Sequence, residues 1–347
     1  MKYRTLGRTG LRVSELCLGT WSLSGQWGAD VEPGIAAIRR AFELGVNFFD
    51  TAYAYGEGAA ETALARGLGE LIATHRDELV IATKGGIRVE QDAAGGWTIE
   101  RDSSAAYLRT TLEHSLRLLG TDYVDVYFIH WPDRSRPYAE AAVAMNELVQ
   151  EGLVRHVGLS NFTVAEMQAF REGGPFGVAQ VPYNLLWRDV DRAVLPYCER
   201  ENVGVMGWSA LASGLLTGAL GRGHRFDAGD WRGRTPSAGE GTDRMDALPG
   251  LFQGADEQLN AVIDRLKGEA DARGVSLAQL ALAWVLSHPS GIIPIVGAQE
   301  PAHAEASAAA VDLELTAEEA AQLTAIASGL PSVQLAAEDY EPEQELV

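Results

Sequence analysis

The sequence predicts an α/β fold in which eight parallel strands, each followed by a helix, close into a (β/α)8 TIM barrel. Short apolar runs bounded by turn residues recur from one end of the chain to the other, and longer stretches with apolar residues at helical spacing lie between them. Such strict alternation is typical of a closed parallel barrel or a doubly wound open sheet. With 347 residues, 46% of them hydrophobic, the chain can form one barrel as a single domain.

Each of the eight apolar runs has the length of a buried strand. In chain order they are ELCLG (15–19), VNFFD (46–50), ELVIATK (78–84), YVDVYFIH (123–130), LVRHVGLS (153–160), GVAQVPY (177–183), VGVMGWS (203–209) and GIIPIVG (291–297). Ahead of them, segment 2–14 has two short strand-like pieces around Gly7 and Gly10. We expect it to form an N-terminal β-hairpin that plugs the bottom of the barrel.

Several intervals between the strands carry helix signals. Pro33 is expected to open the helix after the first strand, and Asp102 or Ser103 to cap a later one. Thr316 and Glu319 have the spacing of a capping box, which predicts an additional C-terminal helix.

We assign residues 1–337 to the barrel with its hairpin and terminal helix. Residues 338–347 hold five acids, which is typical of a solvated acidic tail.

Composition excludes several classes of function. The net charge of -20 repels nucleic acid, and the chain lacks both a signal-peptide-like start and an apolar run of the roughly 20 residues that a membrane helix needs. We therefore expect a cytoplasmic protein without nucleic-acid or membrane partners; the sequence specifies no oligomeric state. Cys17 and Cys198 form no CxxC motif, and the seven histidines form no HxH or HExxH cluster, so no metal is expected.

Polar residues stand at the ends of successive predicted strands. They are Asp50, Lys84, His130, Ser160, Asn161, Trp208 and Ser209, with Gln180 inside the sixth run. In a parallel barrel these ends meet at one mouth, where active sites lie. Lys84 is one of only three lysines in the chain. Its compact ammonium suits a buried partner, although a lysine that caps its strand and reaches water is the structural alternative.

Four of the residues near this mouth form a proton-delivery system for carbonyl reduction. Tyr55 keeps its proton at neutral pH because its ordinary pKa is about 10, and a nearby ammonium would lower that pKa. Lys84 can supply the charge, Asp50 can hold Lys84, and a neutral His130 can orient the carbonyl by a hydrogen bond. Singly, each has a structural alternative: a cap for Asp50, a rim aromatic for Tyr55, and a satisfied core histidine for His130.

The chain resembles the aldo-keto reductase superfamily across nearly its whole length. The matching stretches are LGRTGLRVSELCLGT, NFFDTAYAYG, IATKGG, DYVDVYFIHWPD, GLSNF, QVPYNLLWR and SALASGLLTG. The family's four catalytic positions fall on Asp50, Tyr55, Lys84 and His130, all with the expected residue types. The resemblance implies an oxidoreductase that transfers hydride between NAD(P)H and an aldehyde, ketone or sugar, with Tyr55 as general acid.

The resemblance also implies a set of cofactor contacts. Ser160, Asn161 and Gln180 are expected to hydrogen-bond the nicotinamide carboxamide, and Trp208 to stack on its ring, where relatives more often have tyrosine. The other expected contacts are Gly19, Thr20, Asp50, Ser209, Leu211, Gly214, Gly297, Gln299 and His303. The family favours NADPH, but Gln299 replaces a basic residue of many relatives. We therefore expect NADP(H) to be used and NAD(H) to be discriminated against only weakly.

Tryptophans concentrate in the predicted strand ends and the loops that follow them. Trp21, Trp27, Trp97 and Trp131 are expected to wall the substrate pocket, although core packing explains some tryptophans equally well. Three alternatives compete with a reductase of this kind. Metal-dependent hydrolysis occurs on many barrels, but the histidine clusters it would need are absent here. A Rossmann dehydrogenase requires a GxGxxG fingerprint, which is absent here. A non-catalytic regulatory protein of the same fold would bind the nucleotide without turnover.

Overall fold

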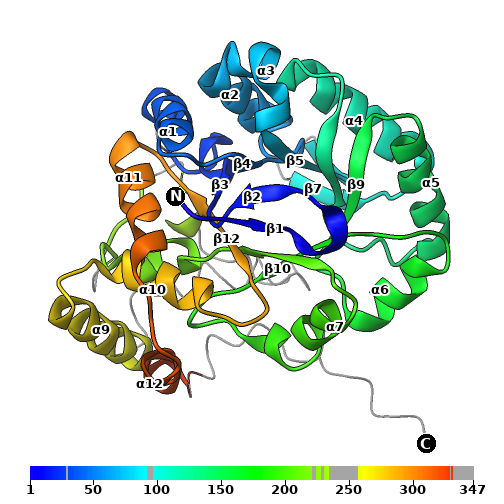
Figure 1. Ribbon diagram of the computed structural model, residues 1–347. Coiled ribbons are helices and arrows are strands. Elements are labelled where there is room, and N and C mark those ends of the chain that lie inside the picture. The colour runs from blue at the N-terminus through cyan, green and yellow to red at the C-terminus, as the bar shows by residue number, and fades with distance from the viewer. Residues whose placement is uncertain are drawn as a thin grey trace, which may run out of the picture.

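The computed structural model is a closed barrel of eight parallel strands, which confirms the predicted fold (Figure 1). Its strands are β3 (Cys17–Gly19), β4 (Phe48–Asp50), β5 (Val80–Gly85), β8 (Val124–Ile129), β9 (Val154–Ser160), β10 (Val178–Pro182), β11 (Gly204–Trp208) and β12 (Ile293–Gly297). Seven strands lie within the predicted apolar runs, and β5 extends one residue beyond its run, to Gly85. Neighbours along the chain are neighbours in the barrel, and β12 closes it by pairing with β3.

The structure describes residues 1–28, 30–91, 97–220, 224–227, 230–233, 257–328 and 330. The side chains of residues 90, 91, 97 and 98 lie outside the description, and so do the predicted acidic tail at 338–347 and the predicted wall residue Trp97.

Helices surround the barrel (Figure 1). They are α1 (Val31–Glu43), α2 (Ala59–Leu68), α3 (Leu71–Thr74), α4 (Ala105–Leu119), α5 (Tyr138–Gln150), α6 (Val164–Arg171), α7 (Val194–Arg200), α9 (Glu257–Ala272), α10 (Leu277–Leu286), α11 (Pro301–Ala309) and α12 (Ala317–Ala327). Their apolar faces pack on the outer faces of the strands in one large core. No helix among the described residues combines the length and the apolarity needed to cross a bilayer.

Two predicted helix starts are wrong by one or two residues. Helix α1 begins at Val31, because the Asp30 carboxylate accepts the free backbone N–H of Glu32. Pro33 then lies inside the first turn, where its missing N–H costs no hydrogen bond. Helix α4 is capped by the Ser104 hydroxyl and not by Asp102 or Ser103.

The Asp102 carboxylate instead accepts a hydrogen bond from the Ser104 N–H, which fixes the residue that caps α4. At the other end of the chain, α12 begins with the predicted capping box of Thr316 and Glu319, in which each side chain accepts the backbone N–H of the other residue.

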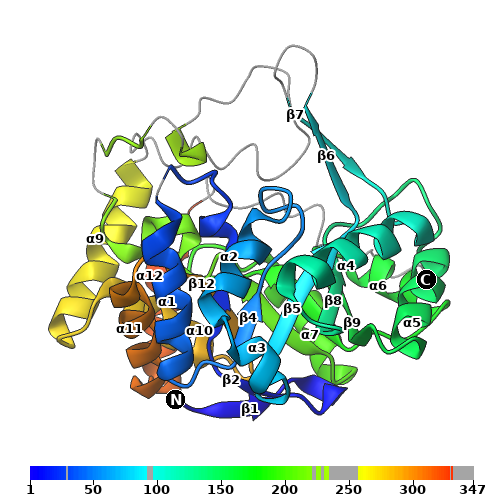
Figure 2. The ribbon, with the colours of Figure 1, turned by 90° about the horizontal axis from the view of Figure 1, so that it is seen from above.

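The predicted N-terminal hairpin closes the bottom of the barrel, below the strand N-termini (Figure 2). It consists of the antiparallel strands β1 (Tyr3–Thr5) and β2 (Arg12–Ser14). Leu6 and Val13 of the hairpin join the buried side chains inside the barrel. Gly7 has a φ of 50°, and a Cβ there would lie 2.2 Å from the backbone nitrogen of Gly204, so only glycine allows this close approach.

A second hairpin stands at the opposite end and was not predicted (Figure 2). Strands β6 (Ile87–Gln91) and β7 (Trp97–Arg101) pair antiparallel directly after β5. The alternation in IRVEQ and WTIER around the turn-forming DAAGG contains the signal for this hairpin. The hairpin extends the rim on the side of the barrel where the strand C-termini lie.

Candidate active site

A buried lysine links two of the predicted site residues at the strand C-termini. Lys84 on β5 has no exposed surface, and its Nζ donates hydrogen bonds to Asp50 Oδ1 at 2.6 Å and to Tyr55 Oη at 3.1 Å. A third bond, at 2.9 Å, goes to the carbonyl of Thr51. All three ammonium donors are therefore used, two of them in the chain Asp50–Lys84–Tyr55.

The position of Asp50 follows from the barrel register. Asp50 is the last residue of β4 and pairs with Gly19 of β3 and Ala82 of β5. Its second oxygen, Oδ2, accepts a hydrogen bond from Nε2 of Gln180 at 2.8 Å, across the interior of the barrel. Because both carboxylate oxygens are bonded and the residue is 2% exposed, Asp50 is a fixed anchor and not a mobile acid.

His130 lies at the end of β8 on the other side of Tyr55. The two rings meet edge to face with their centroids 5.4 Å apart. The backbone of His130 is held at both ends, since its N–H donates to the Gly85 carbonyl and its carbonyl accepts from Asn161 Nδ2. Its Nδ1 atom is buried without a hydrogen-bond partner among the described residues.

Burial controls the protonation of this cluster. Burial lowers the pKa of His130 well below its usual value, and the Lys84 ammonium acts in the same direction, so the imidazole is neutral at pH 7. Burial also opposes the charge on Lys84, but Asp50 and Tyr55 together outweigh that effect and the pKa of Lys84 is raised. The lysine therefore stays charged.

The Lys84 ammonium lowers the pKa of Tyr55, as expected, but the net shift of this pKa is upward. Burial raises the pKa of the Tyr55 hydroxyl, and the lowering effect of Lys84 is present but too small to cancel it. Desolvation of the phenolate thus exceeds the attraction of a single ammonium, whose charge is already shared with Asp50.

The four residues expected to face a nicotinamide form one connected group. Asn161 has a φ of 67°, and its Nδ2 donates to Ser160 Oγ at 3.0 Å. Its Oδ1 accepts from Trp208 Nε1 at 2.9 Å. Ser160 is in register with Gln180, which is itself bonded to Asp50. The Asn161–Trp208 hydrogen bond fixes the plane of the indole. The positions of these residues at strand ends did not predict this bond.

The turn after β11 and the ends of β3 and β12 border the same cluster. Thr20 is buried and donates from both its N–H and its hydroxyl to the Asp50 carbonyl. Gly19 pairs with Gly297, and a Cβ at Gly19 would lie 2.7 Å from the Ile295 side chain. Leu211 precedes the 3₁₀ helix η5 (Ala212–Thr217).

The backbone of this turn is unusual. Ser209 and Gly214 both have positive φ, 56° and 106°. The Ser209 hydroxyl accepts the N–H of Ser213, which keeps the turn closed.

Gln299 and His303 lie apart from the buried cluster, at the start of α11. The N–H of Gln299 donates to Nδ1 of His303 at 3.3 Å, so the two residues are neighbours as expected. His303 is exposed, and its Nε2 lies 3.6 Å from a carboxylate oxygen of Glu300. A histidine beside that acid is a weaker candidate for a phosphate contact than one that faces solvent alone.

Three tryptophans form a cluster beside Tyr55, which we call the tryptophan wall: Trp21, Trp27 and Trp231. The Trp21 ring lies 5.1 Å from Trp27, 5.2 Å from Trp231 and 6.2 Å from Tyr55. Trp231 belongs to this wall although it was not among the predicted pocket residues. Trp131, the residue after His130, contacts a different group: the Arg101 guanidinium lies over its ring, 5.4 Å from the ring centre.

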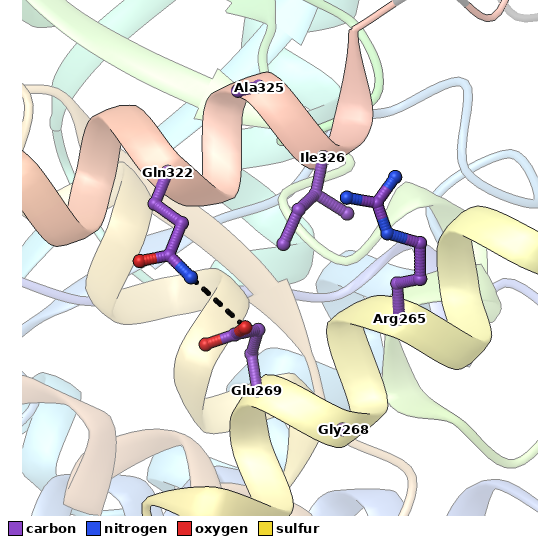
Figure 3. A pocket seen from close by; sticks show the side chains of 6 residues that line it. All are labelled: Arg265, Gly268, Glu269, Gln322, Ala325 and Ile326. Atoms are coloured by element: carbon purple, nitrogen blue, oxygen red, sulfur yellow. Dashed lines mark hydrogen bonds between the residues drawn. The ribbon is translucent and has the colours of Figure 1, made fainter.

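A hollow of about 350 Å³ lies away from these groups, between α9 and α12 (Figure 3). Its lining residues are Arg265, Gly268, Glu269, Gln322, Ala325 and Ile326. The one hydrogen bond drawn across it joins Gln322 to Glu269 at 3.1 Å. None of the strand-end residues reaches this hollow, so the candidate active site is the barrel mouth.

Comparison with known proteins places the chain among the reductases that its motifs resemble. The model of the aldo/keto reductase family matches residues 15–328. An L-glyceraldehyde 3-phosphate reductase of Escherichia coli O157:H7 is 35% identical, over 93% of this chain and 91% of its own length.

Two further relatives are similar over nearly their whole length. An NADH-specific methylglyoxal reductase of Escherichia coli (strain K12) is 29% identical, over 95% of this chain and 99% of its own. The solved structure of a glycerol dehydrogenase from Gluconobacter oxydans superposes with a TM-score of 0.78 at 32% identity, covering 93% of this chain and 94% of that one.

Proposed function

Because the chain belongs to the aldo/keto reductase family, we propose that it reduces an aldehyde, ketone or sugar carbonyl with NAD(P)H and that Tyr55 donates the proton. The observation that carries the proposal is the position of Lys84 Nζ, which is 3.1 Å from the Tyr55 hydroxyl and 2.6 Å from Asp50. A buried ammonium held by a buried carboxylate and aimed at a phenol is a means of stabilising a phenolate.

The residues around Tyr55 fit a nicotinamide. Ser160, Asn161 and Gln180 bring amide and hydroxyl groups to one side of the mouth, which suits a carboxamide that both donates and accepts. Trp208 offers a flat ring that its bond to Asn161 holds in place. When bound, the reduced nicotinamide would supply the hydride, which is the cofactor's own chemistry.

The protein's side chains divide the remaining work. Tyr55 gives its phenolic proton to the carbonyl oxygen of the substrate, and Lys84 stabilises the phenolate left behind. Asp50 keeps Lys84 charged and in place. His130, neutral at pH 7, donates from its ring N–H to the same carbonyl oxygen and so sets its orientation before the proton moves.

Cofactor choice is the second part of the proposal. We infer that NADP(H) is used and that it is discriminated only weakly from NAD(H), by less than about a hundredfold. Gln299 can offer only neutral hydrogen bonds to a 2′-phosphate, and Glu300 beside it carries the wrong charge. A relative that is 29% identical is named as NADH-specific, which supports the use of NAD(H) by this chain.

The substrate class follows from the tryptophan wall. Its rings lie next to Tyr55, so a ring-bearing carbonyl compound would bury apolar area there that an aldehyde of two carbons cannot. The test is a screen of aldehydes, ketones and sugars with both cofactors. Turnover is measured as the loss of absorbance of the reduced nicotinamide. We expect aromatic aldehydes to have the highest kcat/KM. Cofactor binding without turnover of any carbonyl would instead favour a regulatory nucleotide-binding protein.

A further inference from the structure

A short segment far along the chain is attached to the loop after β3. The 3₁₀ helix η6 (Trp231–Gly233) follows Asp230, which forms an isolated antiparallel bridge with Trp27. The N–H of Trp231 donates to the Gln26 carbonyl at 3.1 Å. These backbone contacts bring the third ring of the tryptophan wall to the first two, and Trp231 is 9% exposed.

Arg232 contacts both the tryptophan wall and Asp230. The Arg232 guanidinium lies 4.6 Å from the ring of Trp27 and 4.7 Å from the ring of Phe226. Its Nε and Nη2 bind the Asp230 carboxylate, with Nη2–Oδ2 at 2.6 Å. The side chains of this ion pair are 14% and 5% exposed, so the pair is largely removed from water.

The remaining edge of Arg232 reaches the turn after β11. Its Nη1 donates to the Ser213 carbonyl at 3.1 Å. Ser213 and Gly214 both have positive φ, 51° and 106°, so this carbonyl points where an ordinary helical turn would not send it. A Cβ on Gly214 would lie 2.9 Å from Nη1. The turn is therefore shaped to receive the arginine.

We propose that Arg232 is a positioning residue that joins the tryptophan wall to the turn after β11, and that the site thereby selects ring-bearing carbonyl compounds over small ones. The inference rests on the proposed carbonyl reduction. It adds a determinant of specificity that touches neither the reacting atoms nor Tyr55, and it explains why the wall and the turn would form as one unit.

Only arginine can make these contacts together. The planar guanidinium offers two faces to aromatic rings while its edge bonds a carboxylate and a carbonyl at the same time. Lysine at position 232 would keep the positive charge near Asp230 but lose the stacking on Trp27 and the fork to Ser213. Arg232→Lys is therefore the informative change, since it separates geometry from charge.

The test compares wild type with Arg232→Lys by steady-state kinetics and by near-ultraviolet circular dichroism. We expect KM for benzaldehyde to rise about tenfold, the scale of one stacked and hydrogen-bonded cation, with kcat changed less than about threefold. Values for acetaldehyde should stay constant, because it gains little from the wall. The dichroism of the closely spaced tryptophans should weaken, and the Kd for NADPH should increase because the turn loses its support.

A matched control exists at the opposite end of the barrel. Arg76 stacks on Tyr123 at 4.0 Å, pairs with the buried Asp125 at 2.8 Å, and has a side chain that is 12% exposed. Arg76→Lys removes equivalent contacts at the bottom of the barrel. It should lower stability but leave the benzaldehyde-to-acetaldehyde ratio and the tryptophan dichroism unchanged.

The outcomes separate this inference from the proposed function. If Arg232→Lys leaves the dichroism and the benzaldehyde KM as in wild type, the role of Arg232 is refuted. The same holds if Arg76→Lys produces an equal loss of selectivity. If wild type reduces no carbonyl, the proposed function fails, while the dichroism still decides whether Arg232 positions the wall. Should Arg232→Lys not fold, Asp230→Asn is expected to give a smaller shift in the same direction.

Discussion

Lys84 and Asp50 form an ion pair at 2.6 Å in which the side chains are 0% and 3% exposed. Two charges so far from water depend on each other, because either one alone is desolvated without compensation. The pair is thus a structural requirement of the barrel mouth as well as a proposed part of its chemistry, and the two roles can be separated by mutation.

Lys84→Met leaves the Asp50 carboxylate buried without a compensating positive charge. We expect it to lower the free energy of unfolding by about 3–5 kcal/mol, the usual scale for breaking a buried pair. The double variant Lys84→Met/Asp50→Asn should recover much of this stability in urea unfolding, yet remain inactive. A double variant as unstable as the single one would mean that the charges are not coupled.

Tyr55→Phe removes only the hydroxyl that contacts Lys84. We expect kcat to fall by about 10²–10⁴, the usual contribution of a positioned acid, with cofactor Kd nearly unchanged in a fluorescence titration. Tyr53→Phe is the control, since that ring lies against His114 at 5.5 Å instead. Near-normal turnover by Tyr55→Phe would rule out the tyrosine as proton donor.

The pH profile of carbonyl reduction tests the protonation states. The donor must be protonated, and burial raises the pKa of Tyr55, so kcat/KM should hold at neutral pH and fall only as pH rises above the ordinary tyrosine value of about 10. Burial lowers the pKa of His130, so no change should occur between about pH 6 and 8. A step near pH 6.5 that disappears in His130→Gln would contradict a neutral imidazole.

Cofactor preference tests the phosphate site. The ratio of kcat/KM for NADPH to that for NADH should stay below about a hundredfold in wild type, the scale of one good charged contact. Gln299→Arg should raise the NADPH value about tenfold, because a guanidinium can bind a phosphate with two parallel bonds. The ratio is measured for wild type and for Gln299→Arg at the same salt concentration. A thousandfold preference in wild type, or no gain from the arginine, would place the phosphate elsewhere.

The sequence could predict those parts of the molecule that follow from periodicity and register. All eight barrel strands coincide with predicted runs, with β5 one residue longer at its end than predicted. Residues as distant as Asp50 and Gln180 meet because strand ends converge in any parallel barrel. The capping box at Thr316 was equally local. Such features need only short stretches of sequence and the geometry of a known architecture.

What could not be predicted depends on contacts between distant loops or on a balance of opposing effects. Nothing in the local sequence of Trp231 and Arg232 indicates that they pack on Trp27. The direction of the Tyr55 pKa shift required the extent of burial, because desolvation and the pull of Lys84 oppose each other. A strand pattern indicates which strand-end residues are neighbours, but contacts between distant loops and the size of opposing effects require the three-dimensional structure.

The pairing of β12 with β3 closes the barrel by joining the two ends of the chain, with Ile295 opposite Cys17. During synthesis, Cys17 leaves the ribosome long before Ile295. One edge of β3 therefore stays unpaired until β12 has been made. That edge exposes backbone donors and acceptors to other nascent chains. Closing so long a loop is expected to be a late and slow step in folding. The barrel strand that is synthesised last, β12, is therefore the one that completes the mouth of the barrel.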